Sequence, residues 1–371
     1  MAELMDAMDA QGTHYLQHLQ ALLDDPLQVA RSAANSGTSV VGFVGDEVPV
    51  SLIAAAGALP VRLRSVAGKP TARADEFLES AHSPELRIVV ERWLAGELDF
   101  LSTVIFSRTD DSAQRIYYYL CELQRRGLCG GPRPLLFDLA KIARPTSIAH
   151  SRESTRRLAE ELGVKYAGLA SAVQRVARRG ALLADVRSRR HASAPLPGSI
   201  AWRIHHAAAC DWREAFDDAT RRWIASAPVL SNPRRIVLAG DPPPDDSLHR
   251  VVESAGGSVV LELTESIHGE LSGNAELMDA VADNLHACRS PVWAMREDGH
   301  WTSSCAQRVQ ADAVVFWLIE ENEALPWEIA RQVRDLREQH IPTLLLTRQP
   351  WKVDEPARKQ LKDFVTGLEM R

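Results

Sequence analysis

The chain has 371 residues, of which 45% are hydrophobic and 25% charged, a composition typical of folded globular proteins with room for two cores. The formal net charge of -6 lacks the basic excess of proteins that bind nucleic-acid backbones, so we expect no nucleic-acid partner. No apolar run reaches the roughly 18 residues of a membrane span, and no signal-peptide pattern opens the chain. We therefore expect a cytoplasmic protein. Its five scattered cysteines argue against a disulfide framework.

In chain order, residues 1–36 are expected to form a helical segment. Strand-like runs then alternate with helical patterns through residues 37–150 and again through 231–371, as in βαβ units with parallel sheets. Residues 151–230 carry amphipathic helical patterns without a strand. We expect an α/β fold with two Rossmann-like lobes and a helical connector. The expected strands are SVVGFV (39–44), LPVRL (59–63), TVIF (103–106), RPLLFDL (133–139), RRIVLAG (234–240), SVVLEL (258–263), AVVFWL (313–318) and PTLLLT (342–347).

The two strand-rich stretches resemble each other in detail. VVGFVGDEVP, a helical run and LPVRL in the first are echoed by IVLAGDPPP, a helical run and SVVLEL in the second. Each first strand ends in Gly-Asp followed by proline, with Gly45-Asp46 in one and Gly240-Asp241 in the other. Glycine permits a tight turn and aspartate can cap the next helix, so the pattern predicts two similar lobes.

Acidic residues follow the third strand of each lobe. FSRTDDSAQR (106–115) contains Asp110 and Asp111, and IEENEALPWE (319–328) contains Glu321 and Asn322. Open parallel sheets bind ligands beyond the carboxyl ends of their strands, so both groups are expected at such rims, bordering one cleft if the lobes face each other. One aspartate is explained as a helix cap worth about 1 kcal/mol. The second leaves a ligand-facing role open.

Other patterns are weaker. The acidic residues around Glu321 are best explained as a solvated loop. As metal ligands, their oxygens would suit Mg²⁺, Ca²⁺ or Mn²⁺ better than zinc. The arginine-rich residues 175–191 are interpreted as a solvated helix face, with anion binding as the alternative. The motifs GxxxxGK[ST], GxGxxG after a strand and GxSxG are absent, which disfavours ATP, NAD and the usual hydrolase elbow.

In four ordered pieces, the chain resembles the subunits of 2-hydroxyacyl-CoA dehydratases and benzoyl-CoA reductases. The pieces are VVGFVGDEVPVSLIAAAGALPVRL, ADEFLESAHSPELRIVVERWLAGELDFLSTVIFSRTDDSAQR, PRRIVLAGDPPPDDSLHRVVESAGGSVVLEL, and ADAVVFWLIEEN with IPTLLLT. The resemblance implies two Rossmann-like lobes and assembly of two related subunits. It also implies an iron–sulfur cluster held between the lobes by three cysteines, which an ATP-driven activator reduces for radical chemistry on an acyl-CoA thioester.

This sequence departs from the family at all three ligand positions. The family's Cys-Pro corresponds to Ser83-Pro84, its Cys-Asp-Ser corresponds to Asp110-Asp111-Ser112, and its third cysteine corresponds to Asn322 or an adjacent glutamate. Iron–sulfur clusters are held mainly by thiolates. We therefore expect no iron–sulfur cluster, no other cofactor and no metal ion.

The function we expect is that of a cluster-less family member that binds an acyl-CoA or related thioester, as a homodimer or as a heterodimer with a related subunit. One alternative is a non-radical lyase or hydrolase in which Asp110, Asp111 and Ser83 are catalytic, with or without a hard divalent metal. Another is a structural assembly subunit. The residues expected to bind substrate are Gly45, Asp46, Ser51, Ser112, Glu321 and Asn322.

Overall fold

The computed structural model of the protein describes residues 10–66, 68–80, 82–264 and 276–369. Its strands form two four-stranded parallel sheets, one in each lobe, and all eight expected strands are present. The expected α/β class is thereby confirmed. Lobe 1 contains β1 (Val40–Val44), β2 (Leu59–Arg62), β3 (Thr103–Ser107) and β4 (Arg133–Phe137), and lobe 2 contains β5 (Arg234–Gly240), β6 (Gly257–Leu263), β7 (Ala313–Ile319) and β8 (Thr343–Gln349).

The two sheets share one topology. Their strand orders are β2-β1-β3-β4 and β6-β5-β7-β8, which confirms the internal repeat expected from the sequence. In each sheet the winding direction changes between the first and third strands of the lobe, and ligands of such sheets bind beyond the carboxyl ends of these strands.

Apolar side chains fill both faces of each sheet. Every residue of β1 and of β7 is buried, as expected for parallel strands that helices cover on both sides. The helices of lobe 1 are α3 (Gln28–Asn35), α5 (Ala72–Asp75), α6 (Pro84–Leu94) and α7 (Asp111–Arg125) on one face, with α4 (Val50–Ala55) and α8 (Pro145–Glu161) on the other. Those of lobe 2 are α14 (Pro291–Glu297), α15 (Trp301–Arg308) and α16 (Leu325–Glu338) on one face, with α12 (Ser247–Ser254) and α17 (Glu355–Thr366) on the other.

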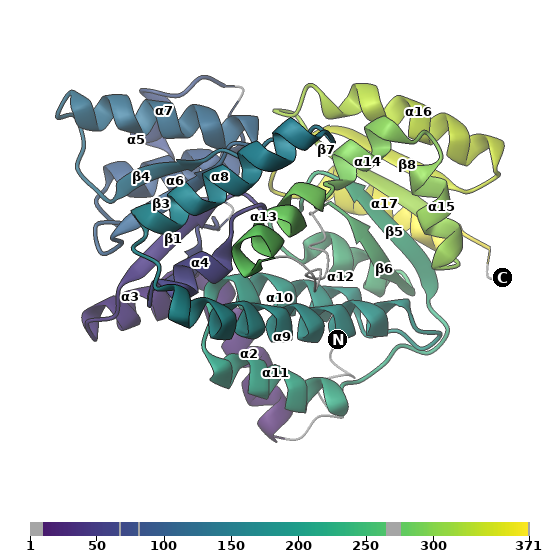
Figure 1. Cartoon of the computed structure of the whole chain (residues 1–371). Coiled ribbons are helices and arrows are strands. Elements are labelled where there is room, and N and C mark those ends of the chain that lie inside the picture. The colour runs from purple at the N-terminus through teal and green to yellow at the C-terminus, as the bar shows by residue number, and fades with distance from the viewer. Residues whose placement is uncertain (1–9, 67, 81, 265–275, 370–371) are drawn as a thin grey trace.

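Helix α13 (Leu277–Ala287) crosses from lobe 2 to lobe 1. It follows β6 in the chain, yet Met278, Val281 and Leu285 belong to the apolar cluster on the α4–α8 face of lobe 1. Arg152 of α8 forms an ion pair with Asp283 of α13, with 2.6 Å between Nη2 and Oδ2. Figure 1 shows α13 alongside α8 between the two lobes. The division of the chain at residues 36, 150 and 230 stays a prediction.

The connector consists of α9 (Tyr166–His191), α10 (Gly198–Cys210) and α11 (Glu214–Ala225), against which α2 (Ala10–Asp24) packs. These helices lie below both lobes in the view of Figure 1. Among the described residues, none of the helices combines the length and apolar character needed to span a bilayer.

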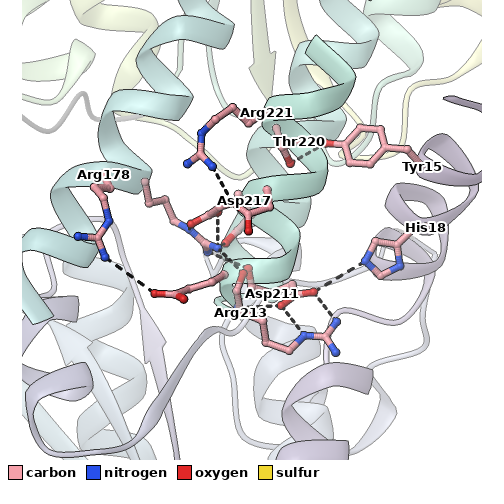
Figure 2. Close-up of polar contacts among 12 residues, drawn as sticks. Tyr15, His18, Arg178, Asp211, Arg213, Asp217, Thr220 and Arg221 are labelled. Atoms are coloured by element: carbon pink, nitrogen blue, oxygen red, sulfur yellow. Dashed lines mark hydrogen bonds and ion pairs between the residues drawn. The ribbon is translucent and has the colours of Figure 1, made fainter. Parts of the chain in front are cut away.

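A buried arginine organises the connector. Arg179 of α9 is 3% exposed and donates to Asp217 of α11, with 2.6 Å between Nη2 and Oδ1. Its Nη1 also donates to the carbonyls of Ala208 and Asp211, each at 2.8 Å. Its guanidinium lies 4.4 Å from the ring centroid of Trp212. Figure 2 shows this part of the connector, where Tyr15 and His18 of α2 also contact Thr220 and Asp211.

Candidate functional site

Two tight turns position the acidic residues that follow the first strand of each lobe. Gly45 and Gly240 have positive φ angles of 92° and 108°. A Cβ atom would lie 2.9 Å from the Ser107 Cβ at Gly45, and 2.3 Å from the Trp317 carbonyl oxygen at Gly240. Only glycine fits such close approaches comfortably. The turns therefore carry Asp46 and Asp241 past the carboxyl end of the neighbouring third strand.

In lobe 1, Asp110 lies at the start of α7 and is half-buried. Its Oδ1 accepts a hydrogen bond from the Ala113 amide at 3.1 Å, which confirms the expected helix cap. Burial raises the pKa of its carboxyl, and the nearby charge of Asp46 raises the pKa further, against hydrogen bonds from the amides of Ala113 and Ser112. Asp46 and Asp110, from the ends of β1 and β3, therefore lie close enough to interact at the expected rim.

Asp46 does not cap the next helix, and its expected part in substrate binding stays a prediction. The N-cap residue of α4 is Pro49, whereas Asp46 forms an ion pair with Arg62 at the end of β2, with 2.6 Å between Oδ1 and Nη2. The adjacent Glu47 is buried against Lys141, with 2.8 Å between Oε1 and Nζ. Neither basic partner was singled out in the sequence, because each comes from a different strand end and only the sheet order brings it there.

The other lobe 1 residues that the sequence predicted for the site have fewer polar side-chain contacts. Asp111 is exposed on the first turn of α7, and Ser51 is buried on α4. Ser83 begins α6, and its Oγ accepts from the Leu86 amide at 3.4 Å. Of the expected catalytic set, the structure places Asp110 with Asp46 and leaves Asp111 facing solvent.

In lobe 2, the acidic group centres on Asp241, which is buried. Its Oδ2 accepts from the Ile319 amide at 2.9 Å, and its Oδ1 accepts from the Asn322 Nδ2 at 2.6 Å. Burial raises the pKa of Asp241 to about 6 against these hydrogen bonds, and the charge of Glu321 adds to the shift. The repeated Gly-Asp turn is the sequence signal that identifies Asp241, which sequence reasoning treated only as a helix cap; the N-cap position of α12 is in fact occupied by Asp246.

The two groups are separate in their bonding. Across the described residues, no hydrogen bond or ion pair links Glu321 or Asn322 with Ser83, Asp110 or Asp111. The cleft that both groups were expected to border stays a prediction.

Ser83, Asp110 and Asn322 share one structural role. Like Ser83 and Asp110, Asn322 accepts with its side-chain oxygen from the backbone amide three residues later, here Leu325 at 3.1 Å. Such bonds satisfy amides that the first turn of a helix leaves free. Ser83 and Asp110 are the N-cap residues of α6 and α7, whereas Asn322 lies two residues before Ala324, the N-cap residue of α16. The three residues expected at the family's thiolate positions thus each accept from an amide at a helix start.

The cysteines lie elsewhere. All five lie within the described residues and none forms a disulfide bond there, and Cys210, Cys288 and Cys305 are buried. Burial raises the pKa of the Cys210 and Cys288 thiols to about 11, which disfavours the thiolate form that binds metal. In the described part of the chain, no three histidine, cysteine or acidic side chains are grouped so that they could hold a metal ion. The residues at the three positions do not fit a thiolate-bound iron–sulfur cluster.

Comparison with known proteins agrees with this architecture. A family model described as 2-hydroxyglutaryl-CoA dehydratase, D-component, matches residues 47–366, a span that contains seven of the eight strands and the acidic residues after the third strand of each lobe. No curated protein matches the chain. Because the model covers most of the sequence, the chain belongs to the 2-hydroxyglutaryl-CoA dehydratase D-component family.

Proposed function

We propose that this chain is a subunit of its family that carries no iron–sulfur cluster of its own and binds an acyl-CoA or related thioester. The observation that carries this proposal is the shared role of Ser83, Asp110 and Asn322. Each is expected to stand where the resembled family has a cysteine, and the side-chain oxygen of each accepts from a backbone amide. Oxygen donors of this kind are poor ligands for a soft cluster.

Helix capping supplies a physical reason for these residues to be retained without iron. Ser, Asp and Asn are the best N-capping residues, and each stabilises its helix by about 1 kcal/mol relative to alanine. A sequence that no longer needs thiolates at the starts of α6 and α7 gains stability by placing such side chains there. The same substitutions remove the soft ligands that low-potential electron storage needs.

A chain without a cluster needs a partner for radical chemistry. We propose a heterodimer with a related, cysteine-bearing subunit, or a homodimer that serves thioester binding alone. Co-expression with a cysteine-bearing relative, followed by size-exclusion chromatography with light scattering, separates these states. A stable heterodimer supports the partner role, whereas exclusive self-association favours the binding role.

Thioester binding is tested by melting temperature. A ligand that binds only the folded state stabilises it, by about 2.7 kcal/mol at one hundred times its dissociation constant. Acetyl-CoA and longer acyl-CoA thioesters are therefore expected to raise the melting temperature in a concentration-dependent way, while free acetate does not. A melting temperature that no CoA thioester changes would contradict the binding role.

A second candidate is a non-radical lyase or hydrolase, favoured by the Asp46–Asp110 pair. Two neighbouring carboxyls at a sheet rim, one with a raised pKa, are the arrangement from which general acids are made. This candidate is supported if the natural protein turns over an acyl-CoA and the Asp110→Asn variant loses that activity without a change in melting temperature. If Mg²⁺ and Mn²⁺ also stabilise the protein through Asp110, a hard-metal version of the same chemistry is favoured.

A further inference from the structure

The edge strands of the two sheets are β2, β4, β6 and β8, and they differ in how open they are to pairing with a further strand. Two of them, β2 and β6, contact α10 of the connector. At β6, the Val259 carbonyl accepts from Arg190 of α9 at 3.0 Å from Nη2, and a Cβ atom on Gly198 of α10 would lie 2.8 Å from the same oxygen. The connector therefore covers these two edges. Arg190 is only 4% exposed, so it does not belong to the solvated helix face expected for residues 175–191.

The edge strand β4 of lobe 1 is blocked by a proline. The Arg133 amide donates to the Ser102 carbonyl, just before β3, at 3.4 Å. Successive residues of a strand direct their hydrogen-bonding groups to opposite sides, so the next residue, Pro134, faces away from β3. Because proline has no N–H group, a further strand cannot form a regular ladder with β4.

The edge strand β8 of lobe 2 has no such block. The Val314 amide of β7 donates to the Pro342 carbonyl at 2.9 Å, which fixes the direction of the groups that follow. The residues that direct their N–H and C=O groups away from β7 are therefore Thr343, Leu345 and Thr347. In the described part of the chain, their amides have no hydrogen-bond partner outside the ladder with β7. The Thr347 carbonyl accepts only from the Gln349 side chain, at 2.8 Å.

The internal repeat makes the contrast between the two edges direct. Pro134 pairs with Val104 in lobe 1, and Thr343 pairs with Val314 at the equivalent position of lobe 2. Edge strands are usually protected by proline, by charged side chains or by a bulge. Residues 341–347 contain none of these charges, and Leu345 is 40% exposed. The irregularity of β8 comes only at its end, where the register with β7 shifts.

We propose that β8 pairs antiparallel with β8 of a second copy of this chain, so that one continuous sheet crosses a two-fold axis. The run TLLLT (343–347) is the same in both directions, so an axis at Leu345 places leucine opposite leucine and threonine opposite threonine. Antiparallel pairing also places each outward amide opposite an outward carbonyl of the other copy. Because the run is uncharged, self-pairing brings no like charges together.

Pairing at β8 is expected to stop at two copies. A two-fold interface uses the same patch on both chains, and the connector and Pro134 leave no second open edge among the described strands. Five paired residues are fewer than the roughly 20–30 on each side of a standard interface, so we expect the dimer to dissociate on dilution. This inference names the partner that the proposed function leaves open, and it does not rest on thioester binding or on the missing cluster.

Sedimentation velocity over a range of protein concentrations tests the interface. The natural protein is expected to form a dimer whose share rises with concentration. Leu345→Lys places two like charges opposite each other at the axis, so it is expected to raise the dissociation constant of the dimer by at least about tenfold. Leu128→Lys is the control, because Leu128 is 50% exposed and lies in lobe 1 between α7 and β4. It is expected to leave the dissociation constant unchanged.

A cysteine at the axis tests the register. In a hydrogen-bonded antiparallel pair the two Cα atoms are about 5.5 Å apart, a separation that a disulfide spans. Mild oxidation of Leu345→Cys is therefore expected to give a covalent dimer. Leu128→Cys and the natural protein, oxidised in parallel, are expected to stay unlinked and so measure any reaction of the five natural cysteines.

The outcomes separate this inference from the proposed function. A natural protein that stays monomeric at its highest soluble concentration overturns the inference, and so does a dimer that Leu345→Lys leaves equally tight. An unchanged melting temperature of Leu345→Lys is expected, because the side chain is exposed, and it shows that the variant is folded. Binding of a CoA thioester to a strictly monomeric protein overturns pairing at β8 and leaves the proposed function standing. A dimer that depends on Leu345 but binds no CoA thioester does the reverse.

Discussion

Lys141 and Glu47 form an ion pair inside the molecule, with 2.8 Å between Nζ and Oε1 and less than a tenth of either side chain exposed. The same ammonium donates to the carbonyls of Leu285 at 2.8 Å and Cys288 at 2.6 Å. Lys141 thereby joins the rim of lobe 1 to the end of α13, where free carbonyls and the helix dipole both favour a cation. All three protons of the ammonium are used, so its burial is compensated.

Removing this lysine is expected to be strongly destabilising. Lys141→Met leaves Glu47 buried and unpaired, and breaking a buried pair in this way costs about 3–5 kcal/mol. Urea denaturation of Lys141→Met and of Arg221→Met measures the difference. Arg221 forms an ion pair with Asp218 in which both side chains are more than half exposed, so its loss is expected to cost less than about 0.5 kcal/mol. Equal losses in the two variants would contradict the buried role of Lys141.

Replacement of either of two adjacent arginines on α9 is expected to change the stability of the protein by very different amounts. Arg179→Met leaves Asp217 without its partner and removes the contact with Trp212, so a loss of about 3–5 kcal/mol is expected. Arg178→Met removes an exposed side chain and is expected to change stability by less than about 0.5 kcal/mol. Thermal denaturation followed by circular dichroism compares them. A stable Arg179→Met variant would show that the network drawn in Figure 2 does not hold the connector together.

Asp110 is expected to act on stability as a helix cap. Asp110→Ala removes the acceptor for the Ala113 amide and is expected to cost about 1 kcal/mol. Asp110→Asn keeps an acceptor and removes the charge that burial and Asp46 disfavour, so it is expected to be neutral or stabilising. The free energies of unfolding of the two variants decide the point. If both lose the same amount, capping is not the role of Asp110.

The raised pKa of Asp241 predicts how the stability of the protein depends on pH. Its pKa is raised from 3.8 to about 6, so between roughly pH 4 and pH 6 the folded state binds more protons at this carboxyl than the unfolded state does. Stability from this group is therefore present at low pH and falls as the pH rises through that window, by at most about 3 kcal/mol.

The difference in unfolding free energy between the natural protein and Asp241→Asn isolates this contribution across pH 4 to 7. As the pH rises, the natural protein is expected to lose stability relative to Asp241→Asn. A difference that does not change with pH would show that the pKa of the Asp241 carboxyl is not raised.

The strands were predictable because their signals are local. A parallel strand buried on both faces appears as a short apolar run, as in residues 313–319, and the Gly-Asp turns mark where two such runs end. The cap at Asp110 was predictable for the same reason, because its partner lies three residues along the chain.

What the sequence does not reveal depends on residues far apart. Arg179 and Arg190 read as members of a solvated face, because the carboxylates that bury them lie 38 and 72 residues away. The docking of α13 on lobe 1 is equally non-local, since its apolar face is compatible with either sheet. Asp241 was missed as a site residue because its partner Asn322 lies 81 residues along the chain, after the neighbouring strand β7.

The claim that oxygen has replaced sulfur at the cluster positions is tested most directly by anaerobic purification followed by iron and acid-labile sulfide determination. Reconstitution with excess iron and sulfide gives the cluster every opportunity to form, and a cysteine-bearing relative treated in parallel shows that the procedure works. The account predicts a colourless protein with iron and sulfide far below one cluster per chain and no reducible EPR signal. A brown protein with stoichiometric iron and sulfide and a reducible signal would contradict it.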